Sequence, residues 1–155
     1  GIRSVWERME AMGLPRTKVH SKTFLRSTSV APDSSARYGL GVTTANEFAQ
    51  LLAMIYRGEA VSPEASAQMV EIMKRQVYEE GIPRHLPAAA VAHKTGSLSA
   101  ARHDCGIIYS EARDYVLCIL TNRNADTSWR IDNAAHLLTS DLARIVHSHV
   151  AATTD

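Results

Sequence analysis

Four adjacent residues, Lys94, Thr95, Gly96 and Ser97, have the types and spacing that acyl-transfer chemistry needs. A lysine ammonium can lie beside a hydroxyl nucleophile and attract a substrate carboxylate, and a threonine hydroxyl can bind that same carboxylate. Gly96 leaves room for substrate along the chain, and the backbone N–H of Ser97 can donate to a developing oxyanion. The pattern predicts one wall of an acyl-transfer site. The alternative is an ordinary strand end. A Lys-Thr-Gly tripeptide occurs by chance in on the order of a few per cent of chains of this size, so the three residues alone are weak evidence.

Three short segments rich in Val, Ile, Tyr and Cys predict sequential antiparallel strands around this motif, over residues 88–96, 103–110 and 114–122. Their central residues are apolar at consecutive positions, which indicates a sheet covered by helices on both faces. Residues 128–150 predict a final helix. Its apolar stripe is expected to cover one face of the sheet and consists of Ile131, Ala135, Leu138, Leu142 and Ile145. The fold class expected is therefore α/β (α+β).

The first 88 residues are expected to be mostly helical, with a long loop over residues 15–42 that is a candidate active-site loop. The first helix has apolar residues at helical spacing and stops at Gly13. A second begins with the capping-box pair Thr44 and Glu47, and a third has Ser62 as its N-cap. Residues 89–155 then carry the strands and the last helix, and we expect both parts to belong to one domain.

The two cysteines, Cys105 and Cys118, are too few for a disulfide framework or a metal site. A hairpin that pairs Tyr109 with Asp114 places them directly opposite each other. We expect two reduced, buried cysteines, because cysteine packs well as a small apolar residue and directly cross-strand disulfides tend to be strained. A disulfide is the alternative.

Composition excludes several classes of function. The chain has 155 residues, 45% of them hydrophobic, and a net charge of +1 without basic runs, so we expect one core and no nucleic-acid partner. No apolar run approaches the roughly 20 residues that span a bilayer. His147 and His149 point in different directions on a helix, and no metal-binding spacing or cofactor motif occurs, so neither metal nor cofactor is expected.

Residues 82–123 resemble the C-terminal part of the serine β-lactamase and penicillin-binding-protein superfamily, in particular its class A-like members. The helix at 43–59 and residues 9–14 fall in the order that this family uses, so the resemblance runs through nearly the whole chain. The resemblance covers about the second half of that family's domain. It implies that Lys94, Thr95 and the Ser97 amide line a substrate cleft. Arg102 lies where contacts to the substrate carboxylate are expected, although a charged strand end with a local ion pair explains it equally well. Family members usually work outside the cytoplasm, in the periplasm or as secreted proteins.

Two departures from the family pattern limit this interpretation. The family's S-x-x-K, which holds the nucleophile, and its S-D-N are both absent. Ser140-Asp141-Leu142 is the nearest match to S-D-N, but it ends in Leu and lies within the predicted last helix. The family's loop glutamate is missing too, since Asp33 is the only acid between Pro15 and Val42. Peptidase-like or esterase-like acyl transfer therefore becomes more plausible than class A lactamase turnover.

The chain begins within a helical pattern rather than with methionine, which suggests a piece of a longer protein. We expect part of a serine hydrolase that acts on amide, ester or β-lactam carbonyls through an acyl-serine, with its nucleophile on an N-terminal segment of the same protein. That segment would also cover the exposed third strand, because the family's sheet has five strands. The alternatives are a non-catalytic penicillin-binding-like sensor or binding module and an inert product of proteolysis.

Overall fold

The computed structural model describes residues 1–86 and 90–153. Its contacts divide the chain into two compact units, Gly1–Leu51 and Leu52–Asp155, and the boundary falls within helix α3 (Ala45–Tyr56). No helix in the described parts of the chain is long and apolar enough to cross a membrane.

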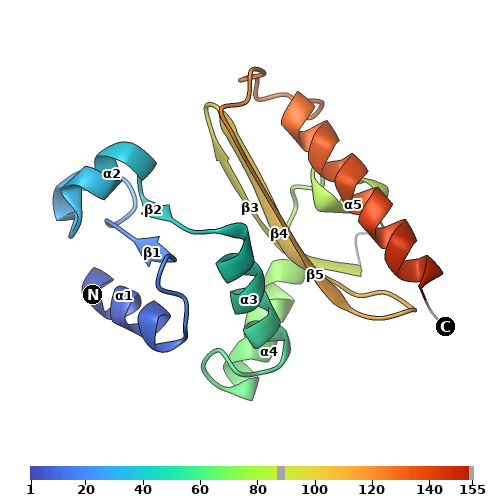
Figure 1. Ribbon diagram of the computed structural model, residues 1–155, viewed down its shortest axis with the longest axis horizontal. Helices are drawn as coiled ribbons and strands as arrows, with labels where there is room; N and C mark the ends of the chain where they lie inside the picture. The colour runs from blue at the N-terminus through green and yellow to red at the C-terminus, as the bar shows by residue number, and fades with distance from the viewer. Residues whose placement is uncertain (87–89, 154–155) are drawn as a thin grey trace. The chain divides into compact units, whose positions relative to one another are not determined.

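The first unit consists of helix α1 (Ile2–Ala11) and the ordered loop that follows it (Figure 1). Gly13, at φ 76°, ends α1 as the sequence predicts. The predicted loop contains a two-stranded antiparallel sheet, which pairs Lys18 with Val42. The Trp6 indole donates to the Val19 carbonyl at 2.5 Å and so ties α1 to this sheet. The remaining elements are β1 (Lys18–Val19), η1 (Arg26–Thr28), α2 (Pro32–Tyr38) and β2 (Gly41–Val42).

The predicted helix caps are present. The Glu47 amide donates to the Thr44 hydroxyl at 3.2 Å, as in a capping box. The Glu47 carboxylate instead accepts from the Arg16 amide and the Thr17 hydroxyl, at 2.9 and 2.7 Å, and so fixes the base of the loop. In the second unit, the Ser62 hydroxyl caps α4 (Pro63–Lys74) by accepting from the Ala65 amide.

The sheet of the second unit has three antiparallel strands in the order β3 (Val91–Leu98), β4 (Ala101–Ile108) and β5 (Tyr115–Asn122). The three predicted strands are confirmed, although residues 88 and 89 of the first prediction lie outside the described residues. Helix α5 (Ala134–Ala152) lies along one face, and α4 contacts β3 (Figure 1).

The core of the second unit forms where α5 and the short helix η2 (Ile82–His85) meet β3 and β4. Small residues on α5, among them Ala135, Thr139 and Ala143, allow this close approach. Of the predicted stripe, only Ala135 is buried. Ile131 lies before α5 begins, and Leu138 and Ile145 are 51% and 56% exposed, so the rest of the stripe is wrong as the core-facing side of the helix. The buried core residues are Ile82, Leu86, Val91, Ile108 and Ala143.

Cys105 and Cys118 lie directly opposite each other on β4 and β5, as the hairpin register predicts. They form a disulfide, so the expectation of two reduced cysteines is wrong. The two adjacent strands hold the Cα atoms 4.0 Å apart, and this proximity brings the sulfurs within bonding distance.

Candidate functional site

The outer edge of β3 presents backbone groups that no strand of the described chain pairs. The Tyr109 amide donates to the Ala90 carbonyl at 2.7 Å, which fixes residues 90 and 109 as a hydrogen-bonded pair. Because such pairs alternate along an antiparallel ladder, residues 92, 94, 96 and 98 bond to β4. The N–H of Ser97 therefore faces the open edge, where a ligand oxygen can accept from it.

The strand pleat separates Lys94 from its neighbours Thr95 and Ser97. Successive side chains point to opposite faces of a sheet, so the side chain of Lys94 projects from one face and those of Thr95 and Ser97 from the other. Lys94 is exposed, and its ammonium donates to the Thr95 carbonyl at 2.5 Å. The Thr95 carbonyl points to the open edge of β3, as the Ser97 N–H does, so the charge of Lys94 lies at that edge.

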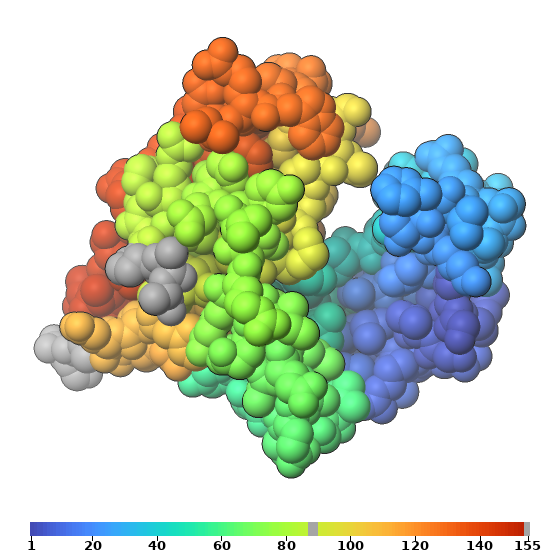
Figure 2. All heavy atoms as spheres, turned by 180° about the vertical axis from the view of Figure 1, so that it is seen from behind, coloured from blue at the N-terminus to red at the C-terminus, as the bar shows by residue number. Residues whose placement is uncertain are grey.

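A cavity of about 290 Å³ lies beside Thr95, Gly96 and Ser97. Figure 2 shows the three segments that form it lying side by side on one face of the second unit, coloured light green, yellow and orange. The structure brings four of the five predicted site residues to this cavity, while Lys94 does not line it. These four are Thr95, Gly96, Ser97 and Arg102. The other lining residues are Tyr78, Glu80, Gly81, His103, Asp104, Trp129, Arg130, Ile131, His136 and Thr139.

Gly96 leaves space that the chain itself does not fill. A Cβ atom at this position would contact only the His103 side chain, at 3.7 Å, which is an ordinary van der Waals distance. Packing within the chain therefore does not require glycine here.

Arg102 is a buried cation, only 2% exposed, that holds two loops together. Its guanidinium donates to the carbonyls of Leu98 and Ala101 on one side and to that of Ser128 on the other, the last at 2.6 Å. The Trp129 ring lies over the guanidinium, 4.6 Å from it. The predicted binding residue is thus at the cavity, but its N–H groups are bonded to backbone carbonyls.

A buried histidine–aspartate pair fixes the wall behind the motif. His93 Nδ1 and Asp104 Oδ1 are 2.8 Å apart, and Asp104 Oδ2 accepts from the Ile82 amide at 2.8 Å. Gly81 is required here, because a Cβ atom would lie 2.4 Å from Asp104 Oδ2. The Asp104 carboxylate, on β4, therefore joins this strand to β3 and to the start of η2. Its two partners lie 11 and 22 positions away in the sequence, and no sequence motif predicts these contacts.

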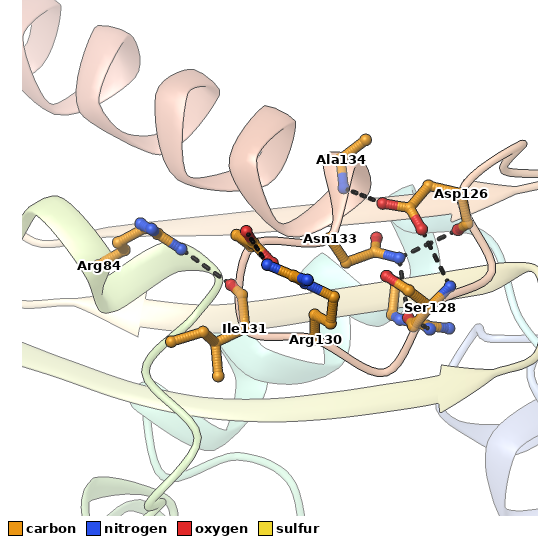
Figure 3. Close-up of polar contacts among 9 residues, drawn as sticks. Arg84, Asp126, Ser128, Arg130, Ile131, Asn133 and Ala134 are labelled. Atoms are coloured by element: carbon orange, nitrogen blue, oxygen red, sulfur yellow. Dashed lines mark hydrogen bonds and ion pairs between the residues drawn. The ribbon is translucent and has the colours of Figure 1, made fainter.

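The loop before α5 is closed by its own polar side chains (Figure 3). The Asp126 carboxylate accepts from the amides of Ser128 and Ala134, both at 2.9 Å. These bonds, that of Ala134 foremost, lower the pKa of Asp126 to about 2. Asn133 donates to the carbonyls of Asp126 and Ser128 and caps α5 by accepting from the Ala135 amide.

Two histidines of the cavity are held in the neutral form. Burial lowers the pKa of His103, and the backbone of Arg102 partly opposes this effect. Burial also lowers the pKa of His136, and the positive charge of Arg102 adds to the shift. Both rings can therefore donate and accept hydrogen bonds at neutral pH.

Among residues 1–86 and 90–153, no group of three or more His, Cys, Asp or Glu side chains could hold a metal ion. The arrangement at β3 instead consists of an outward N–H and hydroxyl groups beside a small cavity. Such donors suit an oxyanion or a carboxylate.

A model of the Beta-lactamase enzyme family matches residues 1–150 of the chain. No curated protein matches the chain. Among solved structures, a β-lactamase from Sphaerobacter thermophilus aligns with a TM-score of 0.81 at 20% identity, covering 100% of this chain and 56% of that one.

Two further structures show the same fold. PBP-A aligns with a TM-score of 0.75 at 24% identity over 96% of this chain and 51% of its own. A class A β-lactamase representative from Bacteroides cellulosilyticus aligns with a TM-score of 0.76 at 21% identity over 96% of this chain and 53% of its own. The chain thus spans about half the length of the structures that it matches.

Proposed function

Because the chain belongs to the Beta-lactamase enzyme family, we propose that it forms part of a serine hydrolase that cleaves amide, ester or β-lactam carbonyls through an acyl-serine intermediate. The observation that carries this proposal is the open edge of β3, where the N–H of Ser97 and the hydroxyl of Thr95 meet the cavity. A PBP-A variant has been solved as an acyl-enzyme complex with penicillin G, which is the chemistry proposed for this chain.

Each residue of the motif has a separate role in the proposal. The serine oxygen attacks the substrate carbonyl, and the Ser97 N–H donates to the oxyanion that develops. The bond from the carbonyl carbon to the amine or alcohol then breaks, the leaving group takes up the serine's proton, and water later hydrolyses the acyl-serine. The Thr95 hydroxyl binds the substrate carboxylate at the cavity. The ammonium of Lys94, held at the open edge by the Thr95 carbonyl, favours the deprotonated serine, and none of the carboxylates in the described residues forms an ion pair with it. Gly96 leaves room for the substrate between these groups.

The nucleophile is assigned to an N-terminal segment of the same protein. No serine among the 155 residues has a lysine three positions later, so the chain does not carry the family's S-x-x-K. Two surfaces are available for such a segment to cover: the edge of β5, which no strand of the described residues pairs, and the exposed stripe of α5 with Leu138, Leu142 and Ile145. Substrate reaches the completed site along β3.

Substitution of Lys94 tests the proposal in the protein completed with its N-terminal segment. Lys94→Ala is expected to lower the acylation rate by about two orders of magnitude or more, because a preorganised charge is removed. The rate is measured with a chromogenic β-lactam under single-turnover conditions. Lys74→Ala, which removes an exposed lysine of α4, is the matched control and should leave acylation unchanged. A loss below about threefold in Lys94→Ala would contradict the role assigned to this lysine.

A further inference from the structure

Two large apolar side chains stand exposed at the mouth of the cavity. Trp129 is 72% exposed and Ile131 is 68% exposed, and both line the cavity beside Thr95 and Ser97. Single exposed apolar residues are common on proteins, but a cluster at the rim of a cavity marks a surface that binds something. An indole ring offers a large contact area for a ligand.

The loop that carries them is ordered by its own hydrogen bonds. Asn133 is fully buried and bonds to the carbonyls of Asp126 and Ser128 at 3.0 and 2.9 Å. Arg84 donates to the Ile131 carbonyl at 2.9 Å, which fixes the side of the loop nearest η2 (Figure 3). Trp129 and Ile131 are therefore presented to solvent by a loop with a defined shape, which lowers the entropic cost of binding a ligand there.

The buried cation Arg102 fixes the plane of the indole. Its guanidinium lies 4.6 Å from the Trp129 ring and bonds to the Ser128 carbonyl, one residue before that tryptophan. Arg102 thus covers one part of the ring, while most of the side chain stays open. The cation is a support for the indole, and the exposed remainder is available to a second planar group.

The lining of the cavity combines apolar and hydrogen-bonding side chains. Trp129, Ile131 and Tyr78 supply the first kind, and Thr95 and Ser97 supply hydroxyl groups. A volume of about 290 Å³ with converging polar groups fits a small molecule or one part of it, whereas a docked helix needs a long apolar groove.

From this geometry we infer that Trp129 determines substrate specificity: it stacks against a planar, apolar substituent attached next to the carboxylate that Thr95 binds. The inference rests on the proposed function for the position of the carboxylate. It adds the substrate class, which is an acyl compound that carries an aromatic group on the carboxylate side of the scissile bond.

Reversible binding to the chain tests this, since binding needs no nucleophile. Two cephems serve as probes, one with a phenylthiomethyl group next to the carboxylate and one with a methyl group there, and calorimetry measures each Kd. The aryl compound should bind about tenfold more tightly, as stacking and apolar burial together provide. Trp129→Ala should abolish the difference. Ile145→Ala, which truncates another exposed apolar side chain, on α5 and outside the cavity, should keep the difference.

Three results would overturn the inference: equal affinity for the two cephems, a preference that survives in Trp129→Ala, or no binding of the aryl compound at about millimolar concentration. A fourth result would show that a segment of the protein itself covers Trp129. In a Trp6→Phe background, acrylamide should quench the fluorescence of Trp129 in the completed protein as strongly as in the chain alone. Weaker quenching in the completed protein would mean that the ring packs within the domain and is not open to substrate. Failure of acylation with the aryl preference intact would count against the proposed function only.

Discussion

Gly96 and Gly81 border the same cavity for opposite reasons. At Gly96 an added methyl group has room within the chain, whereas at Gly81 it would collide with the Asp104 carboxylate. Packing within the chain therefore does not require glycine at position 96, whereas the space beside Gly81 is filled by Asp104, which pairs with His93.

Alanine at each glycine separates these two roles. Gly96→Ala should leave the thermal midpoint of the chain unchanged or slightly raised, since the strand conformation suits alanine. In the completed protein it should lower acylation by on the order of tenfold or more, because substrate no longer lies flat on β3. Gly81→Ala should instead lower the thermal midpoint. Unaltered acylation in Gly96→Ala would contradict the path proposed for the substrate.

The hydrogen bonds of Asp126 predict how the stability of the folded chain depends on pH. The pKa of Asp126 is about 2 in the folded chain, below the ordinary value of 3.8, so the folded state binds fewer protons than the unfolded state in this range. The stabilisation is present above the ordinary pKa and is lost as the pH falls from about 4 to about 2. Urea unfolding across this range should show a smaller acid-induced loss in Asp126→Asn than in the wild type. Equal losses would show that the bonds to Ser128 and Ala134 do not depend on the charge.

At the scale of single residues, the role assigned to Thr95, Gly96 and Ser97 rests on adjacent positions that the sequence alone displays, and it stays a prediction. The bonds of Arg102 could not be predicted in this way, since its partners Leu98 and Ser128 meet it only through the turn and the folded loop. The redox state of the cysteines also depended on geometry: the register was predictable from the hairpin, but the 4.0 Å separation of the Cα atoms was not.

At the scale of elements, α5 shows what periodicity decides. The 3.6-residue pattern correctly predicted a helix against the sheet, and the larger residues Leu138, Leu142 and Ile145 suggested the wrong face. Small residues face the core because η2 and α5 approach closely there. An apolar stripe on a helix therefore identifies a face that needs a cover, without saying which neighbour supplies it.

The two faces of α5 should respond differently to substitution. Ala143→Leu adds three carbon atoms to a fully buried position beside Ile82 and Val91, and overpacking should destabilise the chain by about 1–3 kcal/mol. Leu142→Ala, one position earlier on the exposed stripe, should change stability by less than about 0.5 kcal/mol in the chain alone. Denaturant unfolding measures both. A larger loss of stability in Leu142→Ala than in Ala143→Leu would show that the stripe predicted from the sequence faces the core after all.

At the scale of the whole molecule, the chain spans about half the length of the β-lactamases and PBP-A that it matches. The fold was predictable from the strand pattern and the motif together, since three strands, a final helix and K-T-G occur in the family's order. The N-terminal segment stays a proposal. It is supported by the exposed stripe of α5 and by the edge of β5, which is unpaired among the strands that the structure describes.

Intact-mass spectrometry after incubation with a fluorescent penicillin tests the central claim most directly. The protein is measured as the chain alone and as the chain completed by its N-terminal segment. We predict that the completed protein gains the mass of one penicillin on a serine of that segment, and that the chain alone, of 17.0 kDa, gains none. A completed protein that binds penicillin reversibly without any gain in mass would contradict the acyl-serine mechanism and favour a non-catalytic binding module. Labelling of the chain alone would contradict a nucleophile outside these 155 residues.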